Sequence, residues 1–239
     1  MRLRPAPALA PYLAEGLGTF ALVFAGPGAV AVNAASGGAV TGVGIGMAFG
    51  LIVMAMIFAL GHVSGCHINP AVTIAMRALG RIESRRAAGY VAAQLAGAVL
   101  AGFAIVAIVG SAGDAGASAP RLGGTDAALW SEVILTFLLM FVILSVATDS
   151  RAQGSFAAIA IGGYVGFAAT GWGPVANASM NPARSFGPAA AAGAWDSHWV
   201  YWVGPIAGAL LAAAAYELMR EPHYREPPAP ADPPPEASR

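Results

Sequence analysis

The tripeptide Asn-Pro-Ala occurs twice in the chain, as Asn69-Pro70-Ala71 and as Asn181-Pro182-Ala183. Asparagine caps helix N-termini, and proline at the first helical position gives up no hydrogen bond, so each copy predicts the start of a helix. A single copy would indicate a cap and nothing more. Two copies, each opening a short apolar segment, indicate two helix N-termini whose free N–H groups and positive dipole ends could face a polar molecule.

Three charged side chains lie in otherwise apolar surroundings. Arg184 follows the second tripeptide directly, and Glu15 and Glu132 each lie early in a long apolar run. Charge is costly inside a bilayer, so a charge retained there indicates a wet or functional position, and we expect Arg184 to occupy one rather than a surface loop. The two glutamates need hydrogen-bond donors. We expect them to accept from backbone N–H groups of the two short segments rather than to relay protons.

His62, Cys66 and His67 come shortly before the first tripeptide. The two histidines could line a vestibule, respond to pH or cap helix ends, and these alternatives stay open. Cys66 stands three residues before the first asparagine, as Ala178 stands before the second, and we expect it to face a cavity. No further ligands converge with these side chains, so no metal site is predicted, and a single cysteine excludes an internal disulfide.

The composition of the whole chain indicates a membrane protein. The 239 residues are 57% apolar and 10% charged, against about 25% charged in soluble domains. Twelve arginines balance twelve acidic residues, lysine is absent, and the mean hydropathy is +0.67. This balance excludes a basic nucleic-acid-binding surface and predicts a polytopic protein in a lipid bilayer.

A helix needs about 20 apolar residues to cross a bilayer, and six runs meet that length. They are Tyr12–Val32, Val40–Leu60, Ala88–Gly110, Leu129–Ala147, Phe156–Trp172 and Trp199–Leu218. Two further apolar segments, Ile68–Leu79 and Pro182–Ala194, are too short to cross. An even number of spans puts both ends of the chain on one side of the membrane.

The arginines decide which side that is. Ten of the twelve fall in segments on the side of the two termini, and only Arg121 and Arg184 fall on the other. The positive-inside rule therefore predicts cytoplasmic termini. Residues 1–11 form a short arm, and the proline-rich segment 220–239 is predicted to be a disordered tail. A lysine-free, alanine-rich chain favours a bacterial inner membrane.

The region 12–219 contains an internal repeat, whose two copies are residues 12–110 and 127–219. Residues 90–101 match residues 201–212 at a shift of 111, and 15–20 match 132–137 at a shift of 117. The two tripeptides are 112 residues apart. Each half contains three spans, so the halves must have opposite orientations in the membrane. Such inverted repeats place a functional site near the midplane, with broken helices pointing into it.

Residues 61–73 and 179–185, which contain the two tripeptides, resemble the two signature loops of the major intrinsic proteins, the aquaporin and aquaglyceroporin family. The resemblance covers Pro11–Met219. It implies an all-α transmembrane fold of six spanning helices and two re-entrant half-helices. It also implies a homotetramer whose subunits each conduct water and small uncharged solutes passively, without a cofactor or catalysis. Asn69 and Asn181 would donate to a passing solute and interrupt proton transfer along water.

The same resemblance assigns an outer constriction to Phe49, Ala169, Ala178 and Arg184. Strict water channels carry histidine where this chain has Ala169, so the opening is expected to be wider and less polar. The second loop is similar to the plant nodulin-like branch, which implies permeation of glycerol, urea, ammonia or uncharged metalloid acids beside water. Glycerol channels usually carry aspartate where this chain has Ser185, which leaves the solute open.

Two other classes of protein fit part of the pattern. A secondary transporter can also have inverted repeats and broken helices, but it needs a coupling site, and Glu15 and Glu132 are the only candidate carboxylates. An intramembrane enzyme would need Ser64 to act with His62 or His67, and no third orienting group accompanies them. The sequence therefore favours the passive channel.

Overall fold

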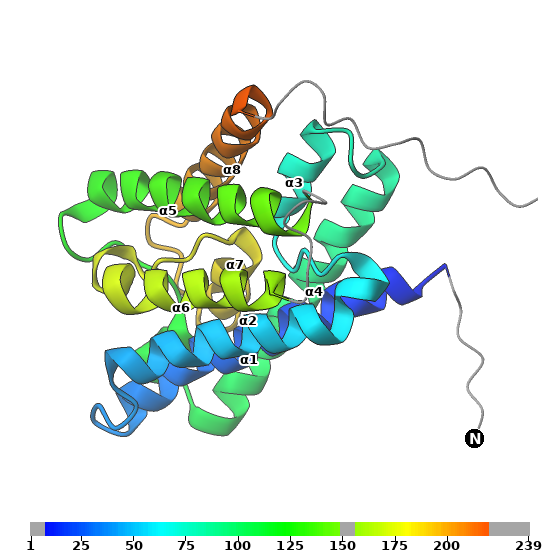
Figure 1. The fold of residues 1–239 in the computed structure, drawn as a ribbon. Helices are drawn as coiled ribbons and strands as arrows, with labels where there is room; N and C mark the ends of the chain where they lie inside the picture. The colour runs from blue at the N-terminus through cyan, green and yellow to red at the C-terminus, as the bar shows by residue number, and fades with distance from the viewer. Residues whose placement is uncertain (1–7, 149–155, 220–239) are drawn as a thin grey trace, which may run out of the picture.

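A computed structural model describes residues 8–148 and 156–219 of the chain, and those residues form helices and loops without strands (Figure 1). The elements are α1 (Ala10–Ala35), α2 (Thr41–Ser64), α3 (Pro70–Ala78), α4 (Ser84–Val109), the 3₁₀ turn η1 (Ala112–Gly116), α5 (Gly124–Ala147), α6 (Ala157–Ala176), α7 (Pro182–Ala192) and α8 (Val200–Met219). The predicted tail, residues 220–239, lies outside the described residues, and so do residues 1–7 of the predicted arm.

Six long helices and two short ones occur in the order that the sequence predicts. Five helices, α1, α2, α4, α5 and α8, are long and apolar enough to cross a membrane. The sixth, α6, has 20 residues and packs along α2 and α5, and its glycines lower its hydropathy. Helix α1 begins at Ala10, two residues before the predicted boundary, because Pro11 is compatible with a first helical turn.

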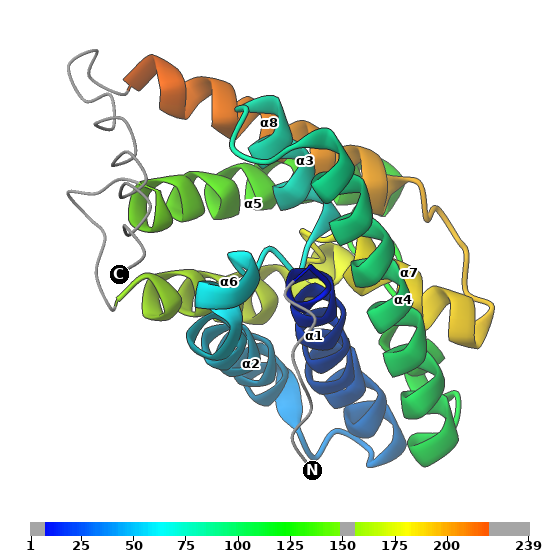
Figure 2. The same cartoon turned by 90° about the vertical axis from the view of Figure 1, so that its right-hand side faces the viewer.

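The contacts between helices repeat from one half of the chain to the other. Helix α1 packs on α4 as α5 packs on α8, and α4 packs on α7 as α8 packs on α3. Helices α2 and α6 pack on each other, as do α3 and α7. In Figure 2, which views α1 nearly end-on, the short α7 lies beside α4 at the right-hand side of the bundle. The packing follows the predicted inverted repeat.

Glycine allows the closest helix crossings, and the same crossing occurs in both halves. A Cβ atom on Gly97 would lie 2.1 Å from the carbonyl oxygen of Gly16, where α4 crosses α1. A Cβ atom on Gly208 would lie 2.2 Å from the carbonyl oxygen of Val133, where α8 crosses α5. Gly97 and Gly208 therefore mark close crossings at equivalent places in the two halves. Small residues serve this purpose in membrane helices, because lipid supplies no hydrophobic force between them.

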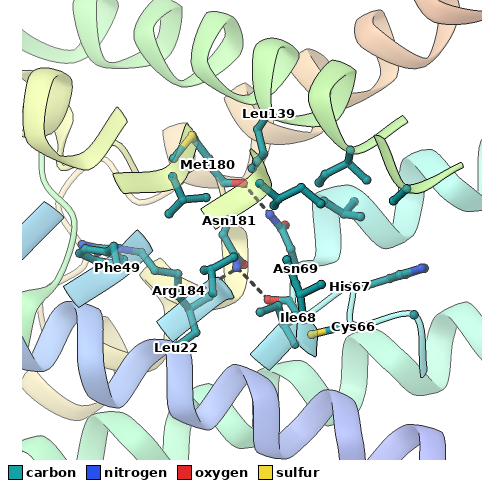
Figure 3. Close-up of a pocket in the computed structure, with 18 of the residues that line it drawn as sticks. Leu22, Phe49, Cys66, His67, Ile68, Asn69, Leu139, Met180, Asn181 and Arg184 are labelled. Carbon is teal, nitrogen blue, oxygen red and sulfur yellow. Dashed lines mark hydrogen bonds between the residues drawn. The ribbon is translucent and has the colours of Figure 1, made fainter. Parts of the chain in front are cut away.

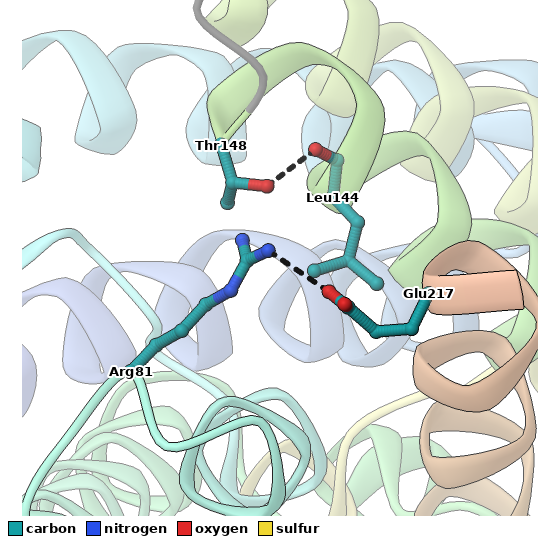
Figure 4. Close-up of polar contacts among 4 residues, drawn as sticks. All are labelled: Arg81, Leu144, Thr148 and Glu217. Atoms are coloured by element: carbon teal, nitrogen blue, oxygen red, sulfur yellow. Dashed lines mark hydrogen bonds and ion pairs between the residues drawn. The ribbon is translucent and has the colours of Figure 1, made fainter. Parts of the chain in front are cut away.

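One polar contact joins the halves at the end of the bundle that carries the last turn of α8. Arg81, in the turn after α3, lies 3.3 Å from the carboxylate of Glu217 on α8 (Figure 4). Nearby, the hydroxyl of Thr148 donates to the carbonyl of Leu144 at 2.6 Å and closes the last turn of α5. Both partners of the ion pair are partly exposed, so its contribution to stability is small.

Candidate functional site

The N-termini of α3 and α7 meet in the middle of the bundle. The side-chain oxygen of Asn69 accepts from the N–H of Ala71 at 2.9 Å and caps α3, and Asn181 caps α7 in the same way. The Nδ2 group of Asn69 donates to the carbonyl of Met180, and that of Asn181 donates to the carbonyl of Ile68, each at 2.8 Å (Figure 3). An amide has two N–H donors, so each asparagine retains one beyond this crossed pair.

The loops that lead into α3 and α7 have the same unusual backbone. Cys66 and Ile68 have φ values of +50° and +43°, and their counterparts Ala178 and Met180 have +43° and +52°. This left-handed region is rare for residues with a Cβ atom, and for a β-branched residue such as isoleucine it is strained. Strain of this kind concentrates at functional sites, and here it recurs at the same two positions before each asparagine.

Each loop is bound to a buried glutamate from the first long helix of its half. Glu15 accepts from the backbone N–H of His67 at 2.8 Å and of Ile68 at 2.6 Å. Glu132 accepts from the N–H groups of Ser179 and Met180, both at 2.6 Å. The structure thus places both glutamates where they satisfy loop N–H groups that would otherwise be unpaired in an apolar interior.

Additional polar residues surround the first loop, and the sequence analysis singled out none of Gln94, Thr73 and Tyr90 as a site residue. Gln94 of α4 donates to Glu15 at 2.7 Å and to the hydroxyl of Thr73 at 3.0 Å. The ring nitrogen Nδ1 of His67 lies 3.1 Å from the same hydroxyl. Tyr90 donates to the carbonyl of Ser64 at 2.8 Å. A glutamine inside an apolar span is a signal that sequence reasoning could have used.

Arg184 is 1% exposed and lies on the first turn of α7. Its Nη1 group donates to the carbonyl of Gly116 at 3.1 Å and to the hydroxyl of Ser118 at 2.6 Å. Its Nε and Nη2 groups have no partner among the described residues. The guanidinium lies 4.9 Å from the ring centroid of Phe49, close enough for a cation–π contact. Two donor nitrogens of this side chain, with three N–H groups between them, are therefore left for a solute.

The position of Phe49 depends on Gly26 of α1. A Cβ atom at Gly26 would lie 2.2 Å from the Phe49 ring, so only glycine leaves room for this ring position. Nothing in the sequence pattern pointed to Gly26 as a determinant of the site. Nor did it point to Ser118, which lies 66 residues before the arginine whose guanidinium it holds.

Three neighbouring cavities, which share lining residues, follow one another through the bundle. The central one, of about 220 Å³, lies beside the crossed asparagines and is lined mainly by apolar side chains, some of them drawn in Figure 3. The outer cavity, of about 340 Å³, shares Phe49 and Arg184 with the central one. The inner cavity, of about 1030 Å³, shares His67 and Thr148 with it. Asn69, Asn181 and Arg184 add polar groups to the mainly apolar lining of the central cavity.

The four residues predicted to form a constriction line the outer cavity, the central cavity or both. Phe49 and Arg184 line both, Ala178 lines the central cavity, and Ala169 lines the outer one. Of the predicted vestibule residues, Cys66 lines the central cavity and His62 the inner one, together with charged Arg81 and other residues.

Residues 2–216 match the family model for the major intrinsic proteins. The chain belongs to the major intrinsic protein family. It is 47% identical over 208 residues to aquaporin NIP1-3 of Oryza sativa, which covers 87% of this chain and 73% of the relative. It is 46% identical to aquaporin NIP1-1 of Zea mays, over 87% of this chain and 74% of the relative.

The fold also matches the crystal structure of the aquaglyceroporin from Plasmodium falciparum, with a TM-score of 0.79 and 24% identity over 87% of this chain and 95% of that one. Family membership and the apolar helices together make this chain an integral, multi-pass membrane protein. It is a passive channel for water and small solutes and not an enzyme. The secondary-transporter alternative is not favoured.

Proposed function

We propose that this channel passes water together with small uncharged solutes such as glycerol, urea, ammonia or uncharged metalloid acids. The observation that carries the proposal is that Phe49 and Arg184 line both the outer and the central cavity, where we place the constriction. There, the unpartnered Nε and Nη2 donors of Arg184 can bind a solute oxygen while the ring of Phe49 supports its carbon skeleton. Ala169 and Ala178 leave the other sides of the opening small and apolar.

The crossed asparagines supply the means to exclude protons and ions. The remaining N–H groups of Asn69 and Asn181 would donate to one water oxygen, which turns the hydrogens of that water outward along the path. A water held in this way cannot accept a proton from its neighbour on either side. The positive dipole ends of α3 and α7 and the charge of Arg184 add a barrier to cations.

Glu15 and Glu132 act as loop supports in this account rather than as proton relays. Both carboxylates are fully buried, and every bond that they make within the described part of the chain is accepted from a donor of the bundle. The support role accounts for their place opposite the two strained loops.

We further propose that four copies assemble, each with its own path. A groove of about 400 Å³ runs along the outer face of α2 and α6 and is lined by glycines and by exposed Met47, Leu51 and Phe167. The occupant that best fits a glycine-lined apolar groove is a second copy, since small residues let helices approach closely. We propose cytoplasmic termini because exposed or half-buried arginines lie on the last turn of α3, in the turn that follows it and on the first turn of α4. Composition alone supports a bacterial inner membrane.

Stopped-flow light scattering on proteoliposomes tests the solute proposal. Gradients of sucrose, glycerol and urea should give fast water flow in each case and re-swelling with glycerol and urea but not with sucrose. Ala169→His narrows the opening and adds a donor, so it should reduce glycerol flux more than water flux. Ala107→His, on the exposed face of α4, is the matched control and should change neither. Equal loss of water and glycerol flux in Ala169→His would remove the basis for a wide constriction.

A further inference from the structure

Three buried serines form a continuous hydrogen-bonded chain behind the second half-helix. The hydroxyl of Ser118, in the loop before α5, lies 2.7 Å from that of Ser185 on α7. The hydroxyl of Ser185 lies 2.5 Å from that of Ser179 in the second loop. Ser179 donates to the backbone carbonyl of Asn181 at 2.9 Å, and Arg184 donates to Ser118 at the other end. The three serines are between 0% and 5% exposed.

Counting protons fixes the direction of every bond in this chain. A hydroxyl has one proton, and that of Ser179 goes to the carbonyl of Asn181. The bond between Ser185 and Ser179 must therefore be donated by Ser185. The bond between Ser118 and Ser185 must then be donated by Ser118, which leaves the oxygen of Ser118 to accept from Arg184. All the bonds point the same way, from the guanidinium to the loop carbonyl, and such aligned chains strengthen each other.

This chain determines which nitrogens of Arg184 are available to a solute. Nη1 has two hydrogens, and the carbonyl of Gly116 and the hydroxyl of Ser118 take both. The guanidinium is planar, so fixing Nη1 at two points also fixes the plane in which Nε and Nη2 lie. Ser185 does not touch Arg184, but it accepts the Ser118 proton and so keeps the Ser118 oxygen turned toward the guanidinium.

We propose that Ser118 and Ser185 are positioning residues that set solute selectivity by holding Arg184 against the wall of the constriction. The inference rests on the proposed role of Arg184 in that constriction. Without the chain the guanidinium can swing into the opening. A solute of the size of glycerol is then obstructed more than water, because it needs the full width and both free donors.

In the first half of the molecule, the residue equivalent to Ser185 does not support an arginine within the described part of the chain. Thr73 occupies the place after the first asparagine that Ser185 occupies after the second. Its hydroxyl is bound to Gln94, His67 and the carbonyl of Asn69, with no arginine attached. The inverted repeat therefore keeps a hydroxyl at both positions, while only the second connects to the constriction.

Glycerol and water permeabilities of Ser118→Ala, Ser185→Ala and the double variant in proteoliposomes test the proposal. Each single change should lower the glycerol-to-water ratio by about threefold to tenfold, the size expected for one net hydrogen bond. The double variant should be no worse than Ser118→Ala alone, because both changes break the same chain. Ser118→Thr keeps the accepting hydroxyl and should retain the wild-type ratio. Ser131→Ala is the matched control, since its buried hydroxyl bonds only to Ala128 of its own helix.

The outcomes separate this inference from the proposed function. Suppose that the wild type passes water and glycerol and that the serine variants have the same glycerol-to-water ratio as Ser131→Ala. That result overturns the inference and leaves the channel account standing. Additive losses in the double variant also overturn it. A wild-type protein that passes no water overturns both. If Ser185→Ala fails to fold, the comparison of Ser118→Ala with Ser118→Thr decides alone, because both changes lie in a loop.

Discussion

Glu15 and Glu132 occupy equivalent places in the two halves, yet the structure satisfies them differently. Glu15 accepts from four donors, which are the hydroxyl of Ser64, the amide of Gln94 and two loop N–H groups. Among the described residues, Glu132 accepts from two loop N–H groups and no others. The duplicated frame thus preserves the bonds between glutamate and loop, and the surrounding support has diverged.

Other equivalent positions differ in the same sense. Tyr90 donates to the carbonyl of Ser64, whereas the hydroxyl of its counterpart Tyr201 has no partner among the described residues. Where the first half has Gln94, the second has Pro205, which has no side-chain donor. The first loop is therefore fixed by a dense network around one carboxylate. The second is fixed by the serine chain that also holds Arg184, so its support and its selectivity are coupled.

The largest expected effect is a difference in stability between variants of the two glutamates. Glutamine at either position keeps one accepting oxygen and replaces the other by an NH₂ group. Glu15→Gln leaves about two donors unpaired and Glu132→Gln about one, and each buried unpaired donor costs about 1–3 kcal/mol. Glu15→Gln should therefore lower the unfolding temperature of the detergent-purified protein more than Glu132→Gln.

Circular dichroism during heating measures this difference directly. Ser131→Ala, which removes a buried hydroxyl outside both networks, sets the baseline for a small polar change. Equal destabilisation by the two glutamine variants, or a larger effect at Glu132, would show that the extra donors around Glu15 do not stabilise its loop.

A smaller effect is expected from pH, and His198 contributes it in the second half. His198, in the loop before α8, accepts from the indole N–H of Trp202 at its Nε2 atom and packs edge-on to Trp195. Burial lowers the pKa of His198 below its usual value of 6.5. The unfolded chain then binds a proton at a pH where the folded chain does not. Stability from this group is present above pH 6.5 and is lost as the pH falls toward the folded pKa.

The unfolding temperatures of the wild type and of His198→Gln would be measured across this pH range. Their difference separates the stability that His198 contributes from that of the other histidines. The wild type should lose more stability on acidification than the variant. Identical pH profiles would contradict the assignment of this sensitivity to the loop before α8.

Much of the frame could be predicted from local signals in the sequence. Apolar runs of about 20 residues and the paired Asn-Pro steps are written in neighbouring residues, and they gave the six long helices and the starts of α3 and α7. The boundaries moved where polar residues continue a helix beyond its apolar run, as at Ser84 of α4. The surroundings of Arg184 and Phe49 could not be predicted, because Ser118 and Gly26 are ordinary in type. Ser118 meets Arg184, and Gly26 meets Phe49, only through the fold.

The single cysteine offers the most direct test of the central claim that solutes pass between the two half-helices. Cys66 lines the central cavity, and Ala178 lines it at the equivalent position of the other loop. Stopped-flow water permeability would be measured before and after a mercurial, for the wild type, Cys66→Ser and Cys66→Ser combined with Ala178→Cys. We predict block in the wild type, none in Cys66→Ser, and block again in the double variant. Water flux that mercury leaves unchanged in both cysteine-containing proteins would contradict a path between the half-helices.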